Sequence, residues 1–292
     1  MFTVKDRENE KYGKLVLGKR LGRNKHRQSI YLCYCDCGAE ITSCITHLVH
    51  GDRLDCGCEK NDKLYKNIQS RSVSPIFEQI FDGLMLGDGS IHLPFGGKNA
   101  RFSQHCQHRS VLINYISLFN NEQIFFPESN PYERVTESKD GKRLITTYIL
   151  QSTIDYFLTR QYYRWYKNGL KIVPKDLILT PLVIKYWYYG DGGLKYNHHL
   201  TREINFATEG FSLKDVDFLG MLLCDVLGIK KVRFGLKKDS TQSIIIINKS
   251  DISTLLDYIG PCDIPCYQYK WIIDNRELYN NYMHNCPCTV SE

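Results

Sequence analysis

An apolar segment that ends in Gly-Asp-Gly occurs twice in this chain, about one hundred residues apart. Residues 77–86 run into the first copy at 87–89, and residues 181–189 run into the second copy at 190–192. The spacing of the apolar residues before each copy is typical of a helix. Similar patterns follow each copy, and self-similarity at this spacing predicts two subdomains related by a pseudo-two-fold axis.

The two halves are expected to contain the same elements in the same order. Alternating polar and apolar residues predict strands paired as hairpins, and apolar residues at helical spacing predict helices. Each motif helix should therefore be followed by a hairpin, a helix, a second hairpin and a final helix. These elements are expected at 90–103, 110–119, 144–150 and 154–165 in the first half, and at 193–207, 212–227, 243–248 and 251–258 in the second.

Asp88 and Asp191 each follow a predicted helix, which is an unfavourable place for a carboxylate. A helix C-terminus carries partial negative charge, so an acid there costs up to about 1 kcal/mol. If the pseudo-dyad brings the two acids together, each raises the proton affinity of the other. A divalent cation such as Mg²⁺ removes this repulsion, and paired metal ions can hydrolyse a phosphodiester. Gly83 and Gly87 are small enough to let the two helices approach and share the ions.

Half of the twelve cysteines lie in the first fifth of the chain. Residues 1–11 are charged and contain no apolar core, so they do not resemble a secretory signal. We therefore expect reduced thiols and an intracellular protein, for example in a phage-infected bacterial cytoplasm or an organelle matrix. No apolar run approaches the roughly 18 to 20 residues of a membrane-spanning helix.

Two close pairs of cysteines, about twenty residues apart, can supply the four ligands of a tetrahedral zinc site. The expected ligands are Cys35, Cys37, Cys56 and Cys58, with Cys33 as an alternate. A unit of about fifty residues needs such a site to hold its core, although buried free thiols are the alternative. A second zinc cluster is left open, with Cys262, Cys266, Cys286 and Cys288 as its ligands.

Residues 11–27 contain seven Lys or Arg and no acid, in a chain whose net charge is +6. Such a density of cations predicts a surface that contacts phosphates. A solvated charged face is the plainer alternative for each of these residues taken alone.

The segments FDGLMLGDG at 81–89 and IKYWYYGDG at 184–192 resemble the two motifs of single-chain LAGLIDADG homing endonucleases. The resemblance covers residues 74–282 and includes the motif spacing and the strand pattern. It implies an α+β fold of two pseudo-symmetric αββαββα subdomains whose strands form a saddle on DNA. It also implies a monomer that cuts both strands of a long double-stranded DNA target with Mg²⁺ or Mn²⁺.

The resemblance carries specific residues with it. Asp88 and Asp191 match the metal-binding catalytic acids of the family. Lys171 and Lys270 match the lysines of the two active sites, where a lysine can stabilise the negative transition state or help activate water. The backbone carbonyls of Gly87 and Gly190 are expected to be further metal ligands.

Two positions depart from the family pattern or leave it open. Tyr186 stands where a small residue is expected in the second motif helix, so Gly83 opposite must accommodate it. Gln104 is a candidate polar residue of the active site, and its counterpart in the second half is either Thr208 or Glu209.

DNA contacts are expected from the basic N-terminal stretch and from strands rich in Lys, Arg, Asn and Gln. Arg and Lys can read guanine, Asn and Gln can read adenine, and DNA bending can add to specificity. The expected contact residues are Lys14, Lys19, Arg20, Arg23, Lys25, Arg27, Arg101, Lys195, Arg202 and Arg233.

The chain is thus expected to have five parts. They are a small, β-rich, zinc-bound and DNA-contacting domain at 1–58, a basic linker at 59–74, LAGLIDADG subdomains at 75–180 and 181–285, and a tail at 286–292.

Two other functions remain compatible with this sequence. An RNA-splicing maturase or a cleavage-inactive DNA-binding regulator could use the same scaffold, because fold does not fix function. The second alternative function is that of a structural, zinc-dependent adaptor. In that case nucleic-acid binding should be weak and insensitive to salt. Both acids and both lysines are present, which favours the nuclease.

Overall fold

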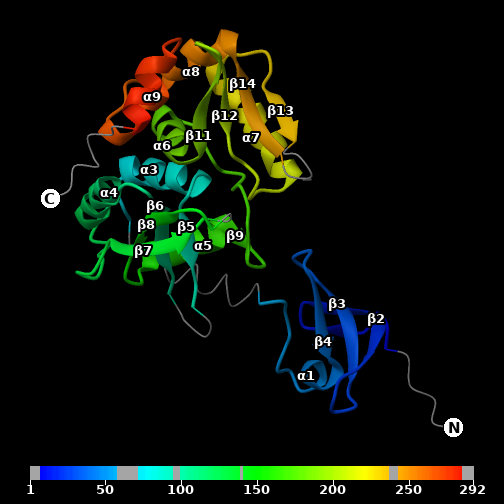
Figure 1. The fold of residues 1–292 in the computed structure, drawn as a ribbon. Helices are drawn as coiled ribbons and strands as arrows, with labels where there is room; N and C mark the ends of the chain where they lie inside the picture. Colours follow the sequence, from blue (N-terminus) through cyan, green and yellow to red (C-terminus); the bar gives the residue numbers. More distant parts are fainter. Residues whose placement is uncertain (1–6, 58–71, 95–98, 139–140, 237–242, 285–292) are drawn as a thin grey trace. The chain divides into compact units, whose positions relative to one another are not determined.

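The computed structural model describes residues 7–57, 72–94, 99–138, 141–236 and 243–284 (Figure 1). The chain divides into two compact units, Met1–Ser70 and Arg71–Glu292. Most of the expected linker, the expected tail and Cys58 lie outside the described residues. In the part that is described, no helix is long and apolar enough to cross a membrane.

The first unit is an antiparallel sheet in the order β1-β2-β3-β4, followed by one short helix. Alternate residues of its central strands, such as Leu17 and Cys33, are fully buried on one face, and Leu48 of the helix covers that face. The elements are β1 Lys11–Tyr12, β2 Leu15–Arg23, β3 Ser29–Cys35, β4 Glu40–Cys44 and α1 Ile45–Val49.

The second unit contains two four-stranded sheets of the same topology, β5-β6-β8-β7 and β11-β12-β14-β13. All neighbouring strands in both sheets are antiparallel. The strands of the first sheet are β5 Ser90–His92, β6 Arg101–Cys106, β7 Tyr132–Glu137 and β8 Leu144–Gln151. The strands of the second sheet are β11 Gly192–Asn197, β12 Leu200–Phe206, β13 Arg233–Leu236 and β14 Ser243–Asn248.

The helices of the second unit complete two αββαββα repeats, so the α+β fold expected from the sequence is confirmed. The repeats contain α3 Pro75–Leu86, α4 Arg109–Asn121 and α5 Tyr156–Trp165, then α6 Pro181–Asp191, α7 Leu213–Leu227 and α8 Ile252–Ile259. Elements outside the repeats are β9 Tyr166–Lys167, β10 Leu170–Lys171, η1 Lys249–Asp251, η2 Pro265–Trp271 and α9 Arg276–His284.

The motif helices α3 and α6 begin in the same way. The side chain of Ser74 accepts a hydrogen bond from the backbone N–H of Phe77, and that of Thr180 accepts one from Val183. Proline occupies the first position of each helix, where its missing N–H is not needed. These caps fix the residue at which each helix starts.

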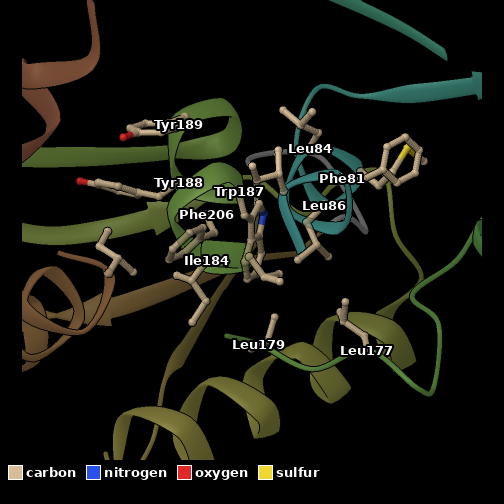
Figure 2. Packing of buried hydrophobic residues seen from close by; sticks show 14 of the residues in the cluster. Phe81, Leu84, Leu86, Leu177, Leu179, Ile184, Trp187, Tyr188, Tyr189 and Phe206 are labelled. Atoms are coloured by element: carbon tan, nitrogen blue, oxygen red, sulfur yellow. The ribbon is translucent and has the colours of Figure 1, made fainter. Parts of the chain in front are cut away.

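The two motif helices pack against each other at the centre of the second unit (Figure 1). A Cβ on Gly83 would lie 2.5 Å from the carbonyl oxygen of Val183 and 2.6 Å from the Cβ of Tyr186. Figure 2 shows Leu84 and Leu86 of α3 in one cluster with Trp187 of α6. Only a glycine at position 83 permits this close approach, as expected from the bulky residue in the second helix.

Candidate active site at the ends of α3 and α6

The two Gly-Asp-Gly segments meet where α3 and α6 end. A Cβ on Gly87 would lie 3.5 Å from the Cα of Gly190, and a Cβ on Gly190 would lie 3.5 Å from Oδ2 of Asp88. Asp191 is the last residue of α6, and Asp88 lies two residues beyond the end of α3. The packing of the helices therefore brings two aspartates that are distant in sequence into one site.

Each segment is held by a lysine that binds backbone carbonyls on both sides of the aspartate. Nζ of Lys171 donates to the carbonyl of Gly89 at 2.8 Å and to that of Gly87 at 3.3 Å.

Lys270 makes the corresponding contacts in the second half, to the carbonyls of Gly192 at 2.7 Å and Gly190 at 3.5 Å. It also donates to the carbonyls of Tyr188 and Tyr189. A cation at the C-terminus of a helix compensates its partial negative charge.

Burial perturbs the ionisation of all four groups. Asp88 is an exposed residue, but desolvation by the protein around its carboxyl group raises its pKa. Burial and then the charge of Asp88 raise the pKa of Asp191 to about 7. Burial lowers the pKa of Lys171 and of Lys270 to about 8, although both carboxylates act in the opposite direction.

A hard divalent cation fits this set of donors. Among the described residues, neither of the two carboxylate groups has a hydrogen-bond or ion-pair partner, although the backbone carbonyl of Asp191 accepts from the N–H of Ala207. Two neighbouring carboxylates with raised pKa values are stabilised when a cation lies between them. The longest contact of Lys171 is to the carbonyl of Gly87, and the longest contact of Lys270 is to the carbonyl of Gly190. These are the two carbonyls expected to bind metal.

A cavity of about 300 Å³ opens beside Asp88 and is lined by His105 and Lys270. His105 is an exposed residue of β6. The preceding residue, Gln104, is only 3% exposed and points to the opposite face of the strand, where its Oε1 has no partner in the described structure. The structure therefore places His105, and not the expected Gln104, in this cavity.

Strand register also identifies the counterpart of Gln104 in the second half. Ser90 pairs with Ser103 as Gly193 pairs with Asn205. The residue equivalent to Gln104 is therefore Phe206, whose ring packs against Trp187, and neither of the two expected counterparts occupies this position.

An ion pair behind the site was not expected from the sequence. Asp82, in the middle of α3, accepts hydrogen bonds from Nη1 and Nη2 of Arg164 and from Nε1 of Trp165. Arg164 also binds Asp176, which lies in the segment that leads to α6. These contacts fix α3 against α5.

Three of the four cysteines expected to bind zinc come together in the first unit. The sulfur atoms of Cys35, Cys37 and Cys56 lie within 4.8 Å of one another. Burial would raise the pKa of Cys35, but backbone N–H and thiol groups of the other two lower it to about 7. Cys33 is fully buried in the core of the unit and is not part of this cluster.

The second zinc cluster left open by the sequence loses one ligand. Cys266 is disulfide-bonded, whereas Cys262 is a free thiol that donates to the carbonyl of Ile264. The remaining two cysteines of that cluster lie outside the described residues.

The expected DNA-contacting residues occur in both units. In the first unit, Lys14 lies between β1 and β2, and the others lie on β2 or in the turn after it; the exposed ones are Lys19, Arg23, Lys25 and Arg27, with Arg20 half-buried. In the second unit, Arg101, Lys195, Arg202 and Arg233 lie on sheet strands.

Comparison with known proteins decides the family. Residues 78–255, more than half of the chain, match the model of the LAGLIDADG DNA endonuclease family. The chain belongs to this family. The motifs of the LAGLIDADG family correspond to the ends of α3 and α6 described above.

Two proteins with similar sequences are a maturase and an uncharacterized protein. The chain is 30% identical over 220 residues to the cytochrome b mRNA maturase bI2 of Saccharomyces cerevisiae, covering 70% of this chain and 50% of the maturase. It is 26% identical over 205 residues to an uncharacterized protein of Methanocaldococcus jannaschii, covering 68% of this chain and 74% of that protein. The chain therefore spans about half the length of the yeast maturase.

A solved structure supports the LAGLIDADG fold. The homing endonuclease I-WcaI, bound to its DNA recognition sequence, superimposes with a TM-score of 0.62 at 23% sequence identity. The match covers 72% of this chain and 92% of I-WcaI.

Proposed function

We propose that this protein is a site-specific DNA endonuclease that hydrolyses one phosphodiester bond in each strand of its target. The observation that carries the proposal is the meeting of Asp88 and Asp191 at the ends of two packed helices. One chain contains both motifs, so we propose that it acts as a monomer. Mg²⁺ or Mn²⁺ bound by the two carboxylates would polarise the phosphate and lower the pKa of water.

The residues around the acids have distinct roles in this proposal. Lys171 and Lys270 hold the two segments through carbonyl contacts and place positive charge where the phosphate becomes more negative. His105 lies in the cavity beside Asp88, where a scissile phosphate and a water molecule would have to enter. Gln104 is assigned no direct contact with substrate.

The partner in this proposal is double-stranded DNA with a long target site. The outer faces of the two sheets, opposite the shared core, would form the saddle that meets the major groove. The structural relative I-WcaI is bound to its DNA recognition sequence, which supports this partner.

The first unit is proposed to bind Zn²⁺ and to add DNA contacts. Three cysteine sulfurs already lie close enough to share an ion, and thiolates are preferred zinc ligands. The exposed cations of β2 and its turn would then contact phosphates.

A second function is favoured by one specific finding, the likeness to a yeast protein named as an mRNA maturase. In this alternative the chain would assist RNA splicing, alone or in addition to cutting DNA. It predicts tight binding to a structured intron RNA and no dependence of that binding on Asp88 or Asp191.

The test is a selection followed by cleavage. The full chain would be incubated with a random double-stranded DNA library in Ca²⁺, and the bound fraction sequenced. The enriched DNA would then be transferred to Mg²⁺ or to a chelator. Cuts in both strands only with Mg²⁺ are expected; no enriched sequence, or cleavage that persists in chelator, would reject the nuclease.

A further inference from the structure

The outer face of the second sheet carries an arginine that reaches across three strands. Arg233 of β13 is paired with Ile246 of β14, and Glu203 of β12 is paired with Asn248 of β14. Paired residues of antiparallel strands point to the same face, so these four side chains share one face. The alternate residues, such as Ile245, are fully buried in the core on the opposite face.

The guanidinium of Arg233 is fixed by two acceptors. Its Nη2 donates to Oε2 of Glu203 at 2.6 Å, and its Nε donates to Oδ1 of Asn248 at 2.6 Å. Ile246 is only 8% exposed although it lies on the outer face. The aliphatic part of an arginine can cover such an apolar residue while the charged end stays in water.

These contacts leave the outer donors of the arginine free. Of the described residues, none accepts a hydrogen bond from Nη1 of Arg233, and the side chain is 44% exposed. Two parallel N–H groups from Nη1 and Nη2 match the O6 and N7 acceptors of guanine in the major groove. Holding the side chain in one orientation reduces the entropy lost on binding.

The carboxylate of Glu203 carries a negative charge on a surface that is proposed to face the phosphates of DNA. The side chain of Glu203 is 13% exposed, and Nε of Arg202 lies 3.7 Å from the same carboxylate oxygen. A free carboxylate here would repel DNA, whereas one neutralised by an arginine orients its partner. An ion pair that only joined strands would have no effect on base preference.

We propose that Arg233, oriented by Glu203 and Asn248, reads a guanine in the target and sets the base preference at that position. This inference rests on the proposed function, because it requires the outer face of the second sheet to lie in the major groove. Arg233 is the specificity residue, and the other two are positioning residues.

The experiment compares sequence preferences of the full chain and its variants. Wild type, Arg233→Lys and Glu203→Gln would each be used to select from a random double-stranded DNA library in Ca²⁺. Lysine retains the charge but cannot make two parallel hydrogen bonds. Arg160→Lys is the matched control, because Arg160 lies on α5 and pairs with Glu78 of α3.

The expected result is confined to one base pair. Arg233→Lys should lose a preference for guanine of roughly 5- to 150-fold there, with all other positions unchanged. Glu203→Gln should weaken the preference at the same position, and Arg160→Lys should change none. Replacing that guanine by 7-deazaguanine, which lacks N7, should weaken binding by wild type but not by Arg233→Lys, and inosine should be tolerated by both.

Two outcomes would overturn the inference, and they are distinguishable. If the Arg233→Lys and Glu203→Gln variants select the same sequence as wild type at every position, Arg233 does not read a base, although the proposed function stands. If wild type selects no sequence at all, the proposed function fails together with this inference.

Discussion

Gly83 and Tyr186 face each other where the two motif helices are closest, and a methyl group on Gly83 would lie 2.6 Å from the Cβ of Tyr186. The same methyl group would lie 2.5 Å from a backbone carbonyl oxygen, which cannot move aside. The distance between α3 and α6, and therefore the position of both aspartates, depends on the absence of a side chain at residue 83.

Gly83→Ala is therefore expected to destabilise the protein. Forcing one methyl group into a well-packed contact costs about 1 to 3 kcal/mol, which chemical denaturation of the full chain would measure. Gly210→Ala is the control, because a Cβ there meets nothing within 4 Å and should change stability little. Equal stability of Gly83→Ala and wild type would contradict the described helix contact.

The Asp82–Arg164 ion pair should matter more than a second ion pair between the same two helices. Arg164→Met leaves the largely buried carboxylate of Asp82 without its cation, and we expect a loss of about 3 kcal/mol in the free energy of unfolding. Arg160→Met breaks the more exposed pair with Glu78 and should cost at most about 1 kcal/mol. Urea denaturation of both variants makes the comparison, and similar losses would refute it.

Protons and Mg²⁺ should compete for Asp191. Its pKa is raised to about 7, first by burial and then by the charge of Asp88, so the carboxyl group binds a proton below that pH. Cleavage at low Mg²⁺ should therefore fall as the pH drops through 7. Tenfold more Mg²⁺ should move the midpoint to lower pH by at most about one unit. A midpoint independent of Mg²⁺ concentration would show that Asp191 does not bind the ion.

The raised pKa of Asp191 also makes the stability of the metal-free protein depend on pH. Between pH 3.8, the ordinary pKa of an aspartate, and about pH 7, Asp191 is more often protonated in the folded protein than in the unfolded chain. The contribution of Asp191 to the free energy of unfolding therefore falls as the pH rises through this range. Asp191→Asn should raise the melting temperature of metal-free protein at pH 8 and have little effect at pH 4.

Zinc should be bound by the first unit and not by the second. Cys37→Ser removes one ligand of the cysteine cluster and should lower the zinc content of the full chain, measured by elemental analysis after dialysis. Cys44→Ser is the control in the same unit, because Cys44 lies outside the cluster. A wild-type chain that takes up no zinc would exclude the site.

Much of this architecture could be predicted because its signals are local. Gly-Asp-Gly after an apolar segment depends only on neighbouring residues, and its repetition predicted that Asp88 and Asp191 belong to corresponding positions. The helix expected at 154–165 begins later, at Tyr156, because the side chain of Asp155 caps it. No element was expected at η2 or α9, although in α9 the apolar residues Leu278, Tyr279, Tyr282 and Met283 recur at helical spacing.

The features that could not be predicted depend on strand register, which cannot be read from a single sequence. Gln104 and His105 are adjacent in the chain, and only the pairing of β6 with β5 and β8 decides which one faces the cavity. Likewise, Arg233 and Glu203 are thirty residues apart and meet only because β14 lies between their strands. The cysteine cluster depends on chain folding in the same way, because β3 ends at Cys35 and Cys37 lies in the following turn.

The most direct test of the central claim is to count the cuts in each strand of a selected DNA target after substitution of one acid. Asp88→Asn and Asp191→Asn preserve the shape of the side chain and remove its charge. Each variant should bind the target in Ca²⁺ as wild type does and make no double-strand breaks in Mg²⁺. Double-strand cleavage by either variant at the wild-type rate would contradict a shared site built from both aspartates.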